Sequence, residues 1–200
     1  TNYYIQFADF KFEHGEDEDA LGIYNKALDF NPDNPYILYE LANYHFLNHQ
    51  REKAKPFYIQ AIRSPEFRLS EKHKVLLKFK RLSEFDKSLN DFTKSIMVLA
   101  ADLHPDNSSI NLITADFIFD SRNYSESIKY YKRVVDSNPN DYLSWFQLIT
   151  SYYNISNYSE MLKNSSEAIL LFPTQPSLYL FSGIANVQLK KYSDAVEVLQ

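Results

Sequence analysis

Apolar residues along most of the chain recur at spacings of three and four, which place side chains on one face of an α-helix. Residues 18–31 show the pattern clearly, with Ala20, Tyr24, Ala27 and Leu28 on one such face. Only three glycines occur in 200 residues, which disfavours a β-rich fold with many tight turns. We therefore expect helices in pairs. The first four helices are predicted over residues 3–13, 18–31, 35–48 and 51–63.

A proline-containing segment recurs with a fixed period. The interval from Pro105 to Pro139 equals that from Pro139 to Pro173, about 34 residues in each case. Asn31–Asn34 carries a similar Asn-Pro segment near the start of the chain. A fixed period of about 20 to 50 residues indicates stacked supersecondary units rather than one central core. The sequence predicts a single array over residues 1–200, with an incomplete last unit. The units are expected at about 1–34, 35–68, 69–107, 108–141, 142–175 and 176–200.

Small and aromatic residues also recur at matching points of the units. Ala8 of the first unit corresponds to Ala42, Ala115 and Gly183 of later units. Small residues let two helix backbones approach closely, and an aromatic ring fills the space beside them. We expect these residues to form the contacts between helices. The other matched sets are Ala20, Ala54, Ser88, Ser127 and Ala195, then Tyr24, Tyr58, Phe92 and Tyr131, and finally Ala27, Ala61, Ser95 and Ala168.

Together these features resemble the tetratricopeptide repeat (TPR), a family of helix-turn-helix units of about 34 residues. The positions typical of the family are occupied in the first unit by Tyr4, Phe7, Ala8, Ala20, Tyr24, Ala27 and Pro32. In the fifth unit they are occupied by Trp145, Leu148, Tyr152, Ala168 and Pro173. The many Tyr, Asn and Lys residues and the loose repeats are similar to those of bacterial multi-repeat TPR proteins. The resemblance implies an all-α, right-handed α-solenoid of about six TPR-like helix-turn-helix repeats.

The third unit departs from this period, since it is about five residues longer than the family's repeat. Its second helix is expected to begin near Phe85 and to continue through Ala101. We therefore predict an over-long helix, or a local change of superhelical twist, near residues 96–105.

Composition and charge exclude several classes of function. The formal net charge of -5 provides no basic face, so no nucleic-acid partner is expected. The chain has no cysteine, which excludes disulfides, thiol catalysis and cysteine-ligated zinc. No apolar run of about 18 residues occurs, so no membrane span is expected within residues 1–200. The compartment stays open between the cytoplasm and an exported location.

No catalytic, cofactor or metal site stands out. His45 and His49 have a spacing that can share a metal, but Phe46 stands where a zinc protease of this motif carries its glutamate. The acidic run Glu16–Asp19 is better explained by the positive end of a helix dipole. No nucleophile motif can be assembled either. We therefore expect no enzyme activity, no cofactor and no metal.

The TPR resemblance implies a concave groove lined by the first helix of each pair. Aromatic rings supply contact area there with few rotors to freeze, although each ring can equally be ordinary packing between helices. A two-carboxylate clamp of the co-chaperone type is not supported, because Tyr39 stands where the clamp has lysine and Lys74 where it has asparagine. The groove residues implied by the family's phase are Tyr36, Tyr39, Asn43, Phe46, His73, Lys80, Arg81, Asp116, Phe119, Phe146, Tyr153 and Asn154.

These observations predict a non-enzymatic scaffold that binds a peptide or a helix of a partner protein in the groove. Two alternatives stay open. The chain can be the adaptor segment of a larger enzyme or cell-envelope assembly whose activity lies outside these residues. It can also self-associate through an uncapped C-terminal repeat, because a solenoid usually ends in a polar capping helix.

Overall fold

A computed structural model describes residues 2–200, in which every regular element is helical. That part of the chain contains twelve α-helices, one short 3-10 helix and no strand, which confirms the predicted all-α fold class. The elements are α1 (Asn2–Glu13), α2 (Asp17–Phe30), α3 (Pro35–Leu47), α4 (Arg51–Arg63), α5 (Leu69–Phe85), η1 (Lys87–Leu89), α6 (Asn90–Leu103), α7 (Ser108–Asp120), α8 (Tyr124–Ser137), α9 (Tyr142–Asn154), α10 (Tyr158–Leu171), α11 (Pro176–Gln188) and α12 (Tyr192–Leu199).

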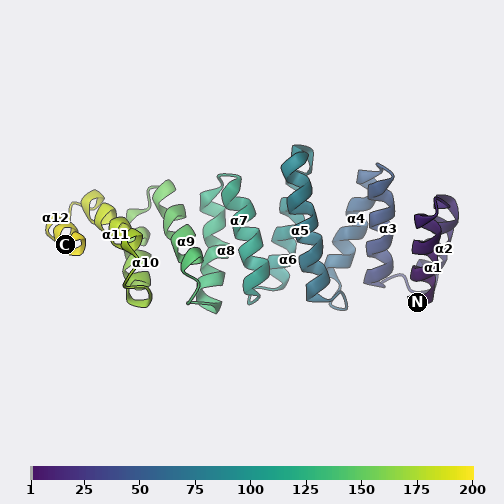
Figure 1. The fold of residues 1–200 in the computed structure, drawn as a ribbon, viewed down its shortest axis with the longest axis horizontal. Helices are drawn as coiled ribbons and strands as arrows, with labels where there is room; N and C mark the ends of the chain where they lie inside the picture. The colour runs from purple at the N-terminus through teal and green to yellow at the C-terminus, as the bar shows by residue number, and fades with distance from the viewer. Residues whose placement is uncertain (1) are drawn as a thin grey trace. The chain divides into compact units, whose positions relative to one another are not determined.

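The chain forms two compact units, and the boundary between Ala100 and Ala101 falls inside α6. In the first unit, α1 packs against α2 and α3 packs against α4 (Figure 1). In the second unit, each helix from α7 to α12 packs against the next one along the chain. Packing of helices on their sequence neighbours is the source of stability in repeat folds.

The second helices of the pairs begin at a regular interval. α2 and α4 start at Asp17 and Arg51, and the same interval separates the starts of α8, α10 and α12 at Tyr124, Tyr158 and Tyr192. An asparagine precedes both α8 and α10, and its side chain accepts a hydrogen bond from a backbone N–H of the first turn. The repeated local sequence thus supplies the cap that begins these helices.

The turn inside each of five pairs contains one residue with a left-handed backbone. The φ angle is 76° at Gly15, 59° at His49, 60° at Arg122, 57° at Ser156 and 61° at Lys190. Only glycine adopts this region routinely, because a Cβ atom meets the neighbouring carbonyl oxygen. Four of these five turns therefore hold a side chain in a disfavoured conformation.

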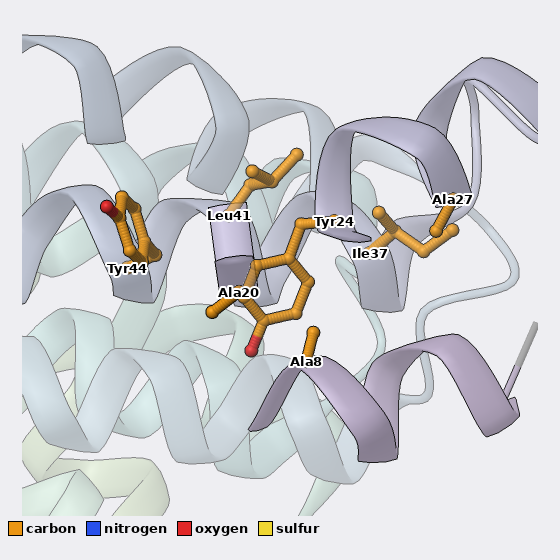
Figure 2. Packing of buried hydrophobic residues seen from close by; sticks show 7 residues of the cluster. All are labelled: Ala8, Ala20, Tyr24, Ala27, Ile37, Leu41 and Tyr44. Carbon is orange, nitrogen blue, oxygen red and sulfur yellow. The ribbon is translucent and has the colours of Figure 1, made fainter. Parts of the chain in front are cut away.

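Buried small and aromatic residues form the contacts between the first helices. Ala8, Ala20 and Ala27 are buried, and the Tyr24 ring extends toward Ala8 (Figure 2). This arrangement follows the expected pairing of a small residue with a ring. The cluster is completed by Ile37, Leu41 and Tyr44 of α3.

The small positions of later pairs are equally close-packed. Ala42 and Ala115 are buried, as is Gly183 on α11. A Cβ atom placed on Gly183 would lie 2.7 Å from the Leu199 side chain of α12. The absence of a side chain at this position therefore permits α12 to approach α11.

The single tryptophan of the chain belongs to the second unit. Trp145 on α9 is buried, and its Nε1–H donates a hydrogen bond of 3.0 Å to the Pro139 carbonyl. A buried indole N–H usually requires such a partner. The bond ties α9 to the proline-containing segment that precedes it.

The third pair differs from the prediction. α6 has 14 residues and is no longer than α2 or α8, whereas α5 has 17 residues and is followed by η1. The prediction of an over-long second helix near residues 96–105 was therefore wrong. The additional residues lie before α6, because its start at Asn90 comes later than the regular interval after Arg51 would place it.

This insertion shifts the packing register of α6 toward its C-terminal end. Thr93, Met97 and Ala100 are buried, whereas Ser88 and Ser95, which matched the small positions by counting, are exposed. Counting from the preceding unit placed the small positions too early, because it assumed that the helix itself held the extra residues.

Candidate functional site

Two predicted groove residues on α3 pack against the same phenylalanine. The Tyr36 ring lies edge-on to Phe67 with ring centres 5.4 Å apart, and the Tyr39 ring lies 5.7 Å from Phe67. The Tyr39 ring also lies 6.1 Å from that of Tyr58. Tyr36 and Tyr39 are only half-buried, so each ring packs on one side and keeps part of its surface in solvent.

Asn43 is the centre of a polar network that joins three helices. Its Oδ1 accepts hydrogen bonds of 2.7 Å from Tyr58 Oη on α4 and from Lys78 Nζ on α5. Its Nδ2 donates a 3.0 Å hydrogen bond to Glu40 Oε2, one turn earlier on α3. Lys78 Nζ also donates to Tyr58 Oη at 3.1 Å. The Asn43 amide is therefore held in one orientation.

The Lys78 ammonium lies among aromatic rings. Its Nζ is 5.5 Å from the ring centres of Phe46 and Tyr58, and 5.9 Å from that of Phe79. Rings within about 6 Å attract a cation through their negative faces. Burial lowers the pKa of Lys78, and the nearby charge of Glu40 opposes this change. The predicted residue Phe46 thus helps to hold a lysine that the sequence did not indicate.

A cavity of about 300 Å³ lies beside this network, between α1, α2, α3 and α5. Asp9, Glu13 and Glu40 line it together with Lys78. Burial raises the pKa of Asp9, and the charge of Glu13 adds to the rise, while a hydrogen bond from Tyr24 opposes it. Burial likewise raises the pKa of Glu40, with the charge of Asp9 adding to the rise. Carboxylates thus outnumber the ammonium in this cavity.

One tyrosine contact recurs in three helix pairs. In each, a tyrosine on the second helix donates its hydroxyl to a residue at the same separation along the chain, on the first helix. The pairs are Tyr24 with Asp9, Tyr58 with Asn43, and Tyr131 with Asp116. Each bond fixes the orientation of a polar side chain on the first helix.

The second unit contains its own aromatic contacts. On α7, the predicted Phe119 ring lies 5.1 Å from the ring of Tyr124. On α9, the predicted Phe146 ring lies 5.4 Å from Phe181 of α11, and the predicted Tyr153 ring lies 6.5 Å from the same Phe181. Tyr153 is 44% exposed, so α9 and α11 together present rings to solvent.

The remaining predicted residues have other surroundings. Asn154 Nδ2 donates a 2.8 Å hydrogen bond to the Thr150 carbonyl, which occupies a donor at the end of α9. His73, Lys80 and Arg81 lie on α5, where Arg81 is exposed and the other two are half-buried. Among residues 2–200, no hydrogen bond, ion pair or ring contact joins the Lys80 or Arg81 side chain to the predicted residues of α3.

Sequence reasoning missed several residues of this region. Asp9 and Glu13 occupy repeat positions that were assigned to the groove in later units. Their positions in the repeat could therefore have identified them. Glu40 and Lys78 fall outside that phase. Lys78 meets Asn43 across 35 residues of sequence, a contact that no local pattern indicates.

Two further findings hold for residues 2–200. None of the helices in this range combines the length and the apolar character needed to cross a bilayer. Within the same range, His, Asp and Glu side chains do not gather in groups of three or more that could hold a metal ion.

Known proteins match this chain over different shares of its length. A family model described as TPR repeat matches residues 8–48. The chain is 22% identical over 198 residues to TPR repeat-containing protein MJ1428 of Methanocaldococcus jannaschii, a match that covers 97% of this chain and 29% of that protein. It is 28% identical over 82 residues to Hsp70-Hsp90 organizing protein 3 of Arabidopsis thaliana, which covers 41% of this chain and 15% of that protein. The chain thus spans less than a third of these curated relatives.

A solved structure of MamA AMB-1 has the same fold. It matches with a TM-score of 0.57 at 13% identity, over 82% of this chain and 87% of that one. Paired helices that begin at one repeated interval define an all-α helical-repeat protein. The family match over residues 8–48 and the archaeal relative show that the chain is similar to tetratricopeptide repeat proteins.

Proposed function

We propose that this protein is a non-enzymatic scaffold that binds a peptide or a helix of a partner protein along the first helices of its repeats. The observation that carries the proposal is the α3 surface, where half-buried Tyr36, Tyr39 and Phe46 accompany the fixed amide of Asn43. Partly exposed rings offer contact area at little entropic cost, and an amide can bond a peptide backbone. Tetratricopeptide repeat proteins in general bind protein or peptide partners, which supports the proposal.

The test compares affinity purifications read by mass spectrometry. The baits are the wild-type protein, the Tyr39→Ala, Phe146→Ala double variant, and Phe85→Ala as a matched control, because Phe85 is 90% exposed on α5 and outside the proposed surface. We expect one set of partners to bind the wild type and the control and to be lost with the double variant. Circular dichroism checks that all three are folded. Full retention of the partners by the folded double variant would contradict the proposal that partners bind in the groove.

A second candidate is that these residues are the adaptor segment of a larger enzyme or cell-envelope assembly. The lengths of the relatives favour it, since the chain spans 29% of the archaeal protein. The test is the full reading frame: the candidate requires a catalytic or anchoring domain in the same polypeptide. A polypeptide made of repeats alone would exclude it.

A third candidate is self-association through α12. Tyr192, Val196 and Leu199 are each more than half exposed on this helix, and apolar side chains gathered on one helix favour burial against a second copy. Light scattering over a range of concentrations tests it. Growth in mass that Val196→Lys abolishes would support this candidate, and a monomer at every concentration would exclude it.

A further inference from the structure

The cavity between α1, α2, α3 and α5 has an unbalanced charge. Asp9, Glu13 and Glu40 contribute three carboxylates, and Lys78 contributes one ammonium. The remaining walls include the rings of Phe12 and Tyr44. A ligand that complements this cavity therefore needs a cationic end and an apolar portion.

Lys78 is already engaged on its own side of the cavity. Its Nζ donates to Asn43 Oδ1 at 2.7 Å and to Tyr58 Oη at 3.1 Å, and the rings of Phe46 and Phe79 lie within 5.9 Å. The Lys78 charge also acts on Glu40, whose pKa it lowers against the larger effect of burial. The cavity thus holds three carboxyl groups and a single ammonium.

The carboxylates have neutral hydrogen-bond donors as their direct partners. Asp9 accepts from the Tyr24 hydroxyl, and Glu40 accepts from Asn43 Nδ2 at 3.0 Å. Burial raises the pKa of both carboxyls in spite of these bonds. A cation that entered the cavity would stabilise the charged forms that burial disfavours.

We propose that this cavity binds the cationic side chain of a lysine or arginine in an extended segment of a partner protein. The inference rests on the proposed function, since it names the chemistry of one subsite on the same surface. Phe12 and Tyr44 would cover the alkyl stem of the bound side chain, whose charged end would face Asp9 and Glu40. The cavity volume of about 300 Å³ is at the lower limit for ligand pockets, which suits one side chain.

The experiment uses a library of ten-residue peptides, acetylated at the amino end and amidated at the carboxyl end. Each position is fixed in turn as lysine, arginine, norleucine, citrulline or glutamate. Norleucine and citrulline preserve most of the shape of the two basic side chains and remove the charge. Binding is measured for the wild type, for Glu40→Gln, and for Glu84→Gln, a matched control at an exposed glutamate of α5 outside the cavity.

We expect wild type and Glu84→Gln to select lysine or arginine at one position of the bound peptides. Replacement of that residue by its uncharged analogue should weaken binding about tenfold, as loss of a partly desolvated charge pair does. In Glu40→Gln the ratio of the affinities for the charged peptide and its uncharged analogue should fall toward one. Asp9→Asn provides a second variant with the same expected direction.

Several outcomes would overturn the inference. Equal binding of lysine and norleucine peptides would do so, as would selection of glutamate or an unchanged cation preference in both Glu40→Gln and Asp9→Asn. If peptides bind without a cation preference and Tyr39→Ala abolishes that binding, the proposed peptide-binding groove remains supported. Only the proposed cation subsite is then wrong. If no peptide binds the wild type, both the subsite and the peptide-binding groove are contradicted.

Discussion

Asn43 accepts two hydrogen bonds at Oδ1, from Tyr58 and Lys78, and donates one from Nδ2 to Glu40. A primary amide has two acceptor sites and two donor hydrogens, so one Nδ2–H is the capacity left for a ligand. A peptide that bonds to Asn43 is therefore expected to offer a carbonyl oxygen. At the residue scale, the free Nδ2–H of Asn43 can bond to only one of the two polar groups of a peptide unit, the carbonyl oxygen.

Glu40 links the stability of the first unit to pH. Burial raises the pKa of Glu40 above its ordinary value of 4.5, so the charged form destabilises the folded state as pH rises through the raised pKa. Glu40→Gln removes this penalty. We expect the variant to have a larger free energy of unfolding than wild type at neutral pH, and the difference to disappear below about pH 4, where both side chains are neutral.

Chemical denaturation at a series of pH values measures this difference, with Glu84→Gln as the exposed control. A stability gain that is independent of pH would contradict the assignment to Glu40 burial. A gain at neutral pH, combined with weaker peptide binding, would show that the carboxylate is kept for function at the expense of stability.

Ala27 tests the packing between helices. It is 2% exposed within the buried cluster of α1, α2 and α3. Ala27→Arg overpacks that contact and buries a charge, so we expect a loss on the order of 3 kcal/mol in the free energy of unfolding. Lys26→Arg at the neighbouring exposed position is the control. A loss below about 0.5 kcal/mol, typical of surface substitutions, would show that the helix phase is wrong.

At the element scale, the turn between paired helices repeats as a backbone conformation rather than as a residue type. Ser156 occupies the left-handed region with φ 57°, as Gly15 does with φ 76°. Ser156→Gly should relieve the steric penalty at that turn and raise the free energy of unfolding by about 0.5 kcal/mol, after the greater freedom of glycine in the unfolded chain is subtracted.

The matched control for this turn is Glu167→Gly in the interior of α10, where Glu167 is exposed. Glycine there should lower stability by about 1 kcal/mol. Thermal or urea denaturation of both variants gives the comparison. Destabilisation of similar size in both would mean that the Ser156 backbone is not strained.

Element boundaries were largely predictable because capping and turn residues are local signals. Asn123 and Asn157 cap their helices through their own side chains, so the sequence itself carries the start of α8 and α10. The third pair was misplaced because Ser88 and Ser95 satisfy the same small-residue spacing as Thr93 and Ala100, which are the buried positions. Spacing alone gives no means of choosing between two registers that both fit.

The polar cavity was less predictable than the helices. Lys78 reaches Asn43 and Tyr58 from another helix pair, through packing that depends on three-dimensional contacts. The longer α5, which also differs from the period, carries this lysine. Matching of repeat positions finds the residues that successive helix pairs share. It does not find a residue, such as Lys78, that only one pair uses.

At the scale of the whole molecule, stability in a repeat protein is a sum of local terms between neighbouring elements. A lesion in one unit is then expected to act mainly on that unit. We expect Ala27→Arg to move part of the helical signal in circular dichroism to lower denaturant, while the emission of Trp145 changes near the wild-type midpoint. Circular dichroism and fluorescence are recorded on the same samples at each denaturant concentration. Equal shifts of the two unfolding midpoints would mean that the chain unfolds as one cooperative block.

The position of the buried Trp145 has a practical consequence for work on this protein. Because no other indole occurs in the chain, the fluorescence of Trp145 reports on the second unit alone. The first unit, which contains the acidic cavity, emits only through tyrosine. A tryptophan introduced at Phe12 in a Trp145→Phe background would instead place the single indole beside that cavity, so that the wild type and the variant each report on one unit.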